Sequence, residues 1–196
     1  MKKLMVVIGV VAVLLALPSV WSLAREGNEA EKLVGKAAPP IKLDLLGGKK
    51  INLEDHKGKD IVVLDFWATW CPPCRMALPV YVEVTKAYKD KHVVFYAVNQ
   101  HEEEGVVRAF VEKSESPFNV LLDRDGAVSD TYKVNGIPQG VIVDEHGVIR
   151  KVHIGFSPDL KTKVEKELDE LIAARDANAK KVPGTPSPSS AAAKSK

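Results

Sequence analysis

The chain has 196 residues, of which 45% are hydrophobic and 28% are charged, and its formal net charge is +2. This balance excludes a disordered polymer, a collagen-like repeat and a polytopic membrane protein. Six of the 28 basic residues lie in the two terminal segments, which contain no Asp or Glu, so residues 25–179 carry 22 basic and 26 acidic residues. Because this body is mildly acidic, we expect no nucleic-acid partner.

The first 24 residues have the pattern of an export signal. Lys2 and Lys3 precede an unbroken apolar run over residues 4–17, and small residues follow it. A short basic region, an apolar core and a small-residue site are typical of a secretory signal peptide. An N-terminal membrane anchor stays open as the alternative, because residues 4–24 carry no charge and are just long enough to span a bilayer. Either segment would export the body to the periplasm or to the extracytoplasmic face of a membrane.

The body predicts strands and helices in alternation, and hence an α/β domain over residues 25–179. Alternating apolar residues on both sides of Gly47-Gly48 predict a β-hairpin over residues 35–60. The apolar run 61–66 lacks alternation, which indicates a central strand buried on both faces. The expected order then continues with a helix after Cys71, a strand over 93–98, a helix over 102–113, a strand over 118–123, a short helix over 127–132, two strands joined at His146-Gly147, and a final helix capped by Ser157 with Pro158 at its first position.

Two polar segments accompany these elements. We interpret Glu102, Glu103 and Glu104 as the acidic first turn of a helix. Residues 180–196 are rich in Pro, Ser, Ala and Lys and have no apolar periodicity, so we expect a disordered tail.

The two cysteines of the chain form the motif Cys71-Pro72-Pro73-Cys74, between the strand 61–66 and a helix. Spacing i, i+3 at a helix start brings the two Cα atoms within the roughly 4.4–6.8 Å that a disulfide tolerates. The helix start also directs unpaired N–H groups and the positive end of the helix dipole at the Cys71 sulfur, which favours the thiolate. We therefore expect Cys71 to be the exposed nucleophile and Cys74 the shielded cysteine that resolves a mixed disulfide. Pro72 and Pro73 fit the helix start but remove two N–H donors.

A permanent staple and half of a zinc site are the alternatives for this pair. A four-residue loop restricts the unfolded chain by roughly 2 kcal/mol, which is less than the ~3 kcal/mol of a 15-residue loop. A zinc site needs two more ligands, and the five histidines lack the H-x(3–5)-H spacing. The pair thus indicates redox chemistry, for which no metal and no cofactor is expected.

Asp65 is the single acid in an otherwise apolar strand, six residues before Cys71. Burial would raise the pKa of its carboxyl, so we expect Asp65 to take a proton from Cys74 during resolution, directly or through a water. The alternative is a carboxylate that reaches solvent or caps a turn at the end of the strand.

The segment FWATWCPPCR, from Phe66 to Arg75, resembles the active site of the thioredoxin superfamily, specifically that of exported TlpA/ResA-like thiol-disulfide oxidoreductases. Gly136-Ile137-Pro138 resembles the cis-proline loop of that superfamily. The resemblance covers about residues 35–175. It implies a thioredoxin-like fold, a central mixed sheet flanked by helices, with an N-terminal β-hairpin extension.

The resemblance also implies roles for individual residues. Pro138 should be cis and face the Cys71 sulfur, and Ile137 should offer backbone hydrogen bonds to an incoming substrate strand. A plain turn proline is the alternative for Pro138. Trp70, together with the two prolines of the motif, should form the apolar surface that meets partner proteins. For Trp67, a place in the core and a place in the site both stay open.

The leading hypothesis is a monomeric enzyme that exchanges disulfides with exported proteins. Its resemblance favours a reductase, for example in cytochrome c maturation, that is recharged by a membrane thiol electron donor. The direction of exchange stays open, since about 30 mV of potential corresponds to only ~1.4 kcal/mol. A thiol peroxidase is an alternative because residues 34–53 resemble the start of peroxiredoxin-like chains, although Thr69 stands two and not three residues before Cys71. A non-catalytic binding module with a structural disulfide is another.

Overall fold

The computed structural model describes residues 28–114 and 117–181. The expected alternation of strands and helices is confirmed. The predicted signal or anchor lies outside the described residues, as does most of the predicted tail. In chain order the elements are η1 (Glu31–Leu33), β1 (Lys42–Leu45), β2 (Lys50–Asn52), η2 (Leu53–His56), β3 (Ile61–Trp67), α2 (Pro72–Ala87), η3 (Lys89–Lys91), β4 (Val93–Gln100), α3 (Glu104–Val111), β5 (Val120–Asp123), α4 (Ala127–Thr131), β6 (Gln139–Val143), β7 (Ile149–Ile154) and α5 (Leu160–Lys181).

The seven strands form one mixed sheet in the order β2-β1-β5-β4-β3-β6-β7. The central pairs β3–β4 and β4–β5 are parallel, and every other pair is antiparallel. All seven residues of β3 are buried, which explains why this strand has no polar alternation. The predicted N-terminal hairpin does not stand apart from the domain, because β1 also pairs with β5 and thereby extends the sheet.

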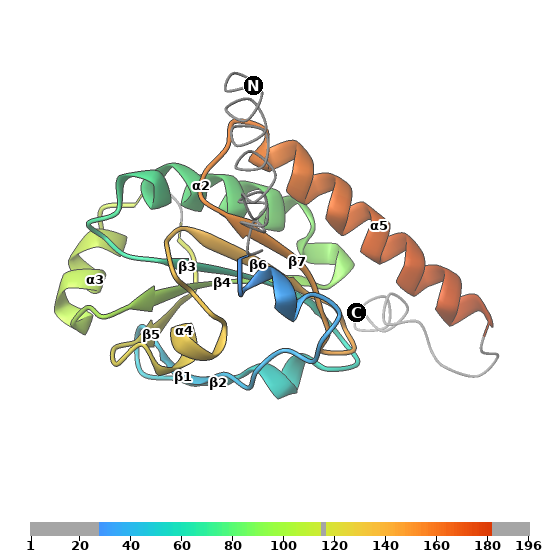
Figure 1. Ribbon diagram of the computed structural model, residues 1–196, viewed down its shortest axis with the longest axis horizontal. Helices are drawn as coiled ribbons and strands as arrows, with labels where there is room; N and C mark the ends of the chain where they lie inside the picture. Colours follow the sequence, from blue (N-terminus) through green and yellow to red (C-terminus); the bar gives the residue numbers. More distant parts are fainter. Residues whose placement is uncertain (1–27, 115–116, 182–196) are drawn as a thin grey trace, which may run out of the picture.

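The two faces of the sheet are covered by different helices, which gives three layers (Figure 1). Val63 and Trp67 of β3 point to the face covered by α2, α3 and α5, here called the α2/α5 face. Leu64 and Phe66 point to the opposite face, where they pack with Tyr132 after α4 and with residues of η1 and η2. Because side chains alternate along a strand, Asp65 lies on the α2/α5 face, between Val63 and Trp67.

The ends of α5 differ from the prediction. The helix begins at Leu160, and the Ser157 hydroxyl donates to Asp159 Oδ1 at 2.6 Å instead of accepting a backbone N–H as a cap. The helix continues to Lys181, so Lys180 and Lys181 do not belong to the predicted tail. Ala and Lys are strong helix formers and prolong the helix beyond its apolar stripe. Within the described ranges, no helix combines the length and the apolar character needed to cross a membrane.

Candidate active site

The two cysteines are joined at the start of α2, where the chain turns out of the carboxyl end of β3. Cys71 is the N-cap residue, and Pro72 and Pro73 occupy the first helical positions, which need no N–H partner. Cys71 and Cys74 form a disulfide with a Cα–Cα distance of 5.3 Å, within the range that the spacing predicts. The N–H of Cys74 donates to the Cys71 sulfur at 3.2 Å. The helix start thus directs a polarised N–H at the sulfur, which favours a thiolate there once the bond is reduced.

Cys71 is less accessible than the sequence suggests. Only 2% of Cys71 is exposed in the disulfide form, against 0% of Cys74. The carbonyl oxygen of Ile137 lies 3.7 Å from the Cys71 sulfur and covers it from the side of the loop before β6. A disulfide sulfur carries no hydrogen, so this contact is packing in the oxidised form.

A shallow depression of about 400 Å³ gives access to Cys71. Trp70, 67% exposed, forms one wall. No charged side chain of the described residues lines it. The lining residues are Trp70, Cys71, Pro72, Pro73, Gln100, Val134, Asn135, Gly136 and Ile137. Four predicted site residues, Cys71, Trp70, Pro72 and Pro73, therefore meet Ile137 at one surface.

The loop opposite the cysteines has the backbone form that the resemblance implied. The Ile137–Pro138 peptide bond is cis. The carbonyl of Pro138 accepts the N–H of Gly155 at 2.8 Å, which ties the loop to the end of β7. Ile137 makes no backbone hydrogen bond within the described residues, so its N–H is available to an added strand, while its C=O lies against the Cys71 sulfur.

Asp65 is completely enclosed in the sheet beneath α2. Its exposed fraction is 0%, and neither carboxyl oxygen has a hydrogen-bond partner among the described residues. The alternative of an Asp65 that reaches solvent or caps a turn is therefore wrong. Burial without a counter-charge raises the pKa of Asp65 well above its ordinary value. Cys74 belongs to the apolar cluster on the α2/α5 face, which is the face on which Asp65 lies. Proton transfer between Cys74 and Asp65 stays a prediction.

Trp67 is a core residue in the structure. Its exposed fraction is 0%, and its ring packs against Phe110 and Phe118 with centroid separations of 5.1 and 6.2 Å. The two tryptophans of the motif thus have different environments, since Trp67 anchors the strand and Trp70 faces the depression.

One contact beside the site was missed by the sequence analysis. Glu102 lies before α3, which begins at Glu104, so it is not part of the helical first turn. Its carboxylate accepts the N–H and the hydroxyl of Thr69 at 2.7 and 2.5 Å and the amide of Asn99 at 2.7 Å. These three hydrogen bonds fix the loop that ends at Cys71. No local pattern signals a contact between residues 33 positions apart.

Comparisons with known proteins agree with this geometry. Residues 34–152 match the AhpC/TSA family. The chain is 37% identical over 166 residues to the thioredoxin-like protein YneN of Bacillus subtilis, covering 82% of this chain and 95% of that protein. It is 35% identical over 158 residues to the thiol-disulfide oxidoreductase ResA of Bacillus cereus, covering 79% and 91%. The crystal structure of a protein assigned as the thiol:disulfide interchange protein DsbE of Chlorobium tepidum superposes with a TM-score of 0.66 at 32% identity, covering 71% of this chain and 97% of that one.

A fold of this kind with a disulfide at the helix start, a cis-proline loop opposite it and relatives of this similarity identifies the chemistry of the pair. The chain belongs to the AhpC/TSA family and is a thiol-disulfide oxidoreductase of the ResA/DsbE type with a thioredoxin-like fold.

Proposed function

We propose that the protein works as a reductase of disulfides in exported proteins. The observation that carries this direction is the small number of groups able to stabilise a Cys71 thiolate. A dithiol becomes a strong oxidant when its reduced form is specially stabilised. Here Pro72 and Pro73 supply no N–H, Cys74 supplies one, and the depression around Cys71 contains no charged side chain of the described residues. With so few groups to stabilise the Cys71 thiolate, the reduced form of the pair gains little stability. The pair therefore favours a low reduction potential and the donation of electrons.

The shape of the site supports an extended protein segment as substrate. Ile137 offers beside the sulfur an N–H and a C=O that make no backbone hydrogen bond among the described residues, as a strand-adding partner needs. Trp70 and the uncharged lining offer apolar contact on the other side. The C-x-x-C-H segment of an apocytochrome c is one substrate of this chemistry. We expect residues 1–24 to place the monomeric domain outside the cytoplasm, where a membrane thiol donor would recharge it.

The direction is tested by the reduction potential of the Cys71/Cys74 couple, equilibrated in thiol buffers and measured by alkylation mass shift. We expect a value below about −230 mV, beside thioredoxin-type reductants. A value above about −180 mV would make the protein an oxidant or isomerase and overturn the proposal.

The two-step scheme is tested by trapping. In the Cys74→Ser variant, Cys71 should still attack a partner disulfide but the mixed disulfide cannot be released. We expect this variant to accumulate covalent adducts with a disulfide-bonded peptide, detected by mass spectrometry. The matched control is the Cys71→Ser variant, in which the remaining Cys74 is fully buried and should form none. Equal adduct formation by both variants would contradict the assignment of Cys71 as nucleophile.

Peroxide reduction is the second candidate, favoured by the family match over residues 34–152. The position of Thr69 speaks against it, because Thr69 stands two residues before Cys71 and its hydroxyl donates to Glu102 at 2.5 Å. We expect the protein to consume hydrogen peroxide no faster than its Cys71→Ser variant. Cys71-dependent consumption faster than disulfide exchange would favour the peroxidase.

A further inference from the structure

A row of residues crosses the sheet from Asp65 to the edge strand β7. The register places Asp65 of β3 opposite Gly140 of β6, and Gly140 opposite His153 of β7. Directly paired residues of antiparallel strands point to the same face, with Cβ atoms about 4.5–5.5 Å apart. Asp65, Gly140 and His153 therefore lie side by side on the α2/α5 face. The middle position carries no side chain, so it leaves space between the acid and the imidazole.

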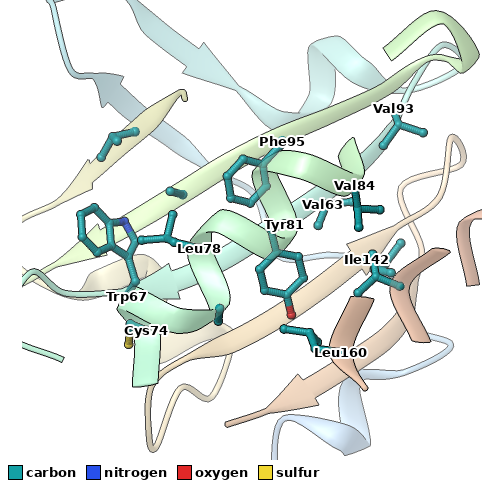
Figure 2. Close-up of a cluster of buried hydrophobic side chains, with 14 of the residues drawn as sticks. Val63, Trp67, Cys74, Leu78, Tyr81, Val84, Val93, Phe95, Ile142 and Leu160 are labelled. Atoms are coloured by element: carbon teal, nitrogen blue, oxygen red, sulfur yellow. The ribbon is translucent and has the colours of Figure 1, made fainter. Parts of the chain in front are cut away.

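The hydroxyl of Tyr81 fills this space. A Cβ atom added to Gly140 would lie 1.9 Å from Tyr81 Oη, so the hydroxyl occupies the place of the missing side chain. The Tyr81 ring descends from α2 and stacks on Phe95 with an interplanar angle of 14°. Figure 2 shows the ring beside Phe95 with its hydroxyl directed toward Leu160. The hydroxyl therefore lies between two titratable side chains, Asp65 and His153.

The far end of the row reaches the protein surface. His153 Nε2 lies 2.7 Å from Glu167 Oε2 of α5, and the two side chains are 12% and 14% exposed. Lys151, on the same strand, lies 3.8 Å from the other Glu167 oxygen. This partly exposed pair touches solvent, whereas Asp65 does not.

We propose that Tyr81 and the His153–Glu167 pair conduct protons between Asp65 and solvent. This inference rests on the proposed function. During release, the Cys74 thiol gives its proton to the Asp65 carboxylate, and the resulting thiolate attacks the Cys71 sulfur. The Cys71–Cys74 bond forms, the bond from Cys71 to the partner breaks, and the partner sulfur leaves as a thiolate that is protonated by solvent.

Asp65 must then lose the proton that it gained. The Tyr81 oxygen accepts a proton from Asp65 while its own proton passes to His153, and His153 delivers one to solvent beside Glu167. Tyr81 and His153 touch neither sulfur, so both act through Asp65. A water molecule between neighbouring groups of the row would find polar partners on both sides and would complete the path for the proton.

The electrostatics of Tyr81 suit this position. Burial raises the pKa of Tyr81 well above its ordinary value, and the nearby Asp65 and Glu167 carboxylates raise it further. The hydroxyl therefore stays neutral at physiological pH, and a neutral hydroxyl is able to donate and to accept at the same time. A permanently ionised group in this place would instead keep a fixed charge next to Asp65 and could not donate and accept at the same time.

The test is chemical rescue of the His153→Ala variant by imidazole. The measurement is a single-turnover experiment that resolves attack on a peptide disulfide from release of the reduced peptide. We expect release to slow about tenfold in this variant and to recover as imidazole is added, with the attack rate unchanged. The matched control is His146→Ala, which removes an exposed histidine from the β6–β7 turn and should show neither effect. Slowing without imidazole recovery would indicate a structural role and overturn the relay.

Tyr81→Phe tests the interior step, because it removes the hydroxyl and keeps the ring that packs on Phe95. We expect a similar loss, about tenfold, confined to release and not recovered by imidazole. An unchanged release rate in Tyr81→Phe overturns the relay. A failure of the proposed function looks different, because the unaltered protein would then release no reduced peptide at all.

Discussion

Asp65 on β3 and Asp123 at the end of β5 are both fully buried, but the hydrogen bonding of their carboxylates is opposite. Both have an exposed fraction of 0%. The Asp123 carboxylate accepts the N–H of Val128 at 3.1 Å and the N–H and hydroxyl of Ser129 at 2.8 and 2.7 Å. Asp65 accepts nothing from the described residues. The first carboxylate holds α4 to the sheet, whereas the second has no hydrogen-bond partner among the described residues and lies six residues before the redox pair.

This difference shows how to distinguish an acid that stabilises the fold from an acid that takes part in a reaction. Burying a polar group without partners costs free energy, so a fold that keeps one gains something other than stability. Asp123 is explained completely by its hydrogen bonds. The burial of Asp65 has no such explanation in its hydrogen bonds, which is consistent with the proton transfer predicted for it.

Cys71→Ser should have the largest effect, and it tests whether disulfide exchange takes place in the region around Asp65. We expect insulin disulfide reduction to fall at least about a thousandfold, because no nucleophile remains. The matched control near Asp123 is Ser129→Ala, which removes one hydrogen bond and should leave the reduction rate within about twofold. Comparable losses in both variants would erase the contrast between the two regions.

Asp123→Asn should be the more damaging change to stability. It removes a charge and places an amide N–H₂ against the N–H donors of Val128 and Ser129. We expect the free energy of unfolding to fall by about 2–3 kcal/mol in urea titrations, because hydrogen bonds to a buried carboxylate are stronger than neutral ones. The reduction potential of the cysteine pair should not move. A shifted potential would show that Asp123 also belongs to the redox site.

The sequence predicted the fold and the reacting groups because both have local signals. The uninterrupted apolar run around Asp65 marked a buried acid, and the spacing of Cys71 and Cys74 at a helix start marked a disulfide. Ser157 and Pro158 predicted the final helix, although α5 begins at Leu160 and the Ser157 hydroxyl donates to Asp159.

What the sequence could not predict depends on contacts between distant segments. The Ile137 carbonyl that covers the Cys71 sulfur comes from 66 positions away. The alignment of Asp65 with His153 depends on the register of three strands, and a slip of one residue would turn either side chain to the other face. Tyr81 reads as an ordinary apolar position of α2 until Gly140 is seen beneath its hydroxyl.

Asp65→Asn should increase stability, in contrast to the loss expected for Asp123→Asn. The pKa of Asp65 is raised in the folded state, so between the unfolded pKa near 3.9 and the folded pKa the native state binds more protons than the unfolded state. Stability therefore decreases as the pH rises through this window. At pH 7 we expect the variant to be more stable on the order of 2 kcal/mol, with the difference disappearing below about pH 4. Urea titrations at both pH values check this, and a gain that persists at low pH would contradict the titration of Asp65 as its cause.

Glu102→Gln should have the smallest effect, because Glu102 combines features of both aspartates. It lies beside the site, as Asp65 does, but its carboxylate is satisfied by Thr69 and Asn99, as that of Asp123 is by α4. The glutamine oxygen still accepts hydrogen bonds, but the charge and one acceptor are lost. We expect unfolding to become easier by about 1 kcal/mol and the rate of disulfide reduction to change less than about threefold. A rate loss as large as that of an Asp65 variant would mean that the position of the loop before Cys71, and not an unsatisfied acid, limits the reaction, since Glu102 reaches the sulfur only through Thr69.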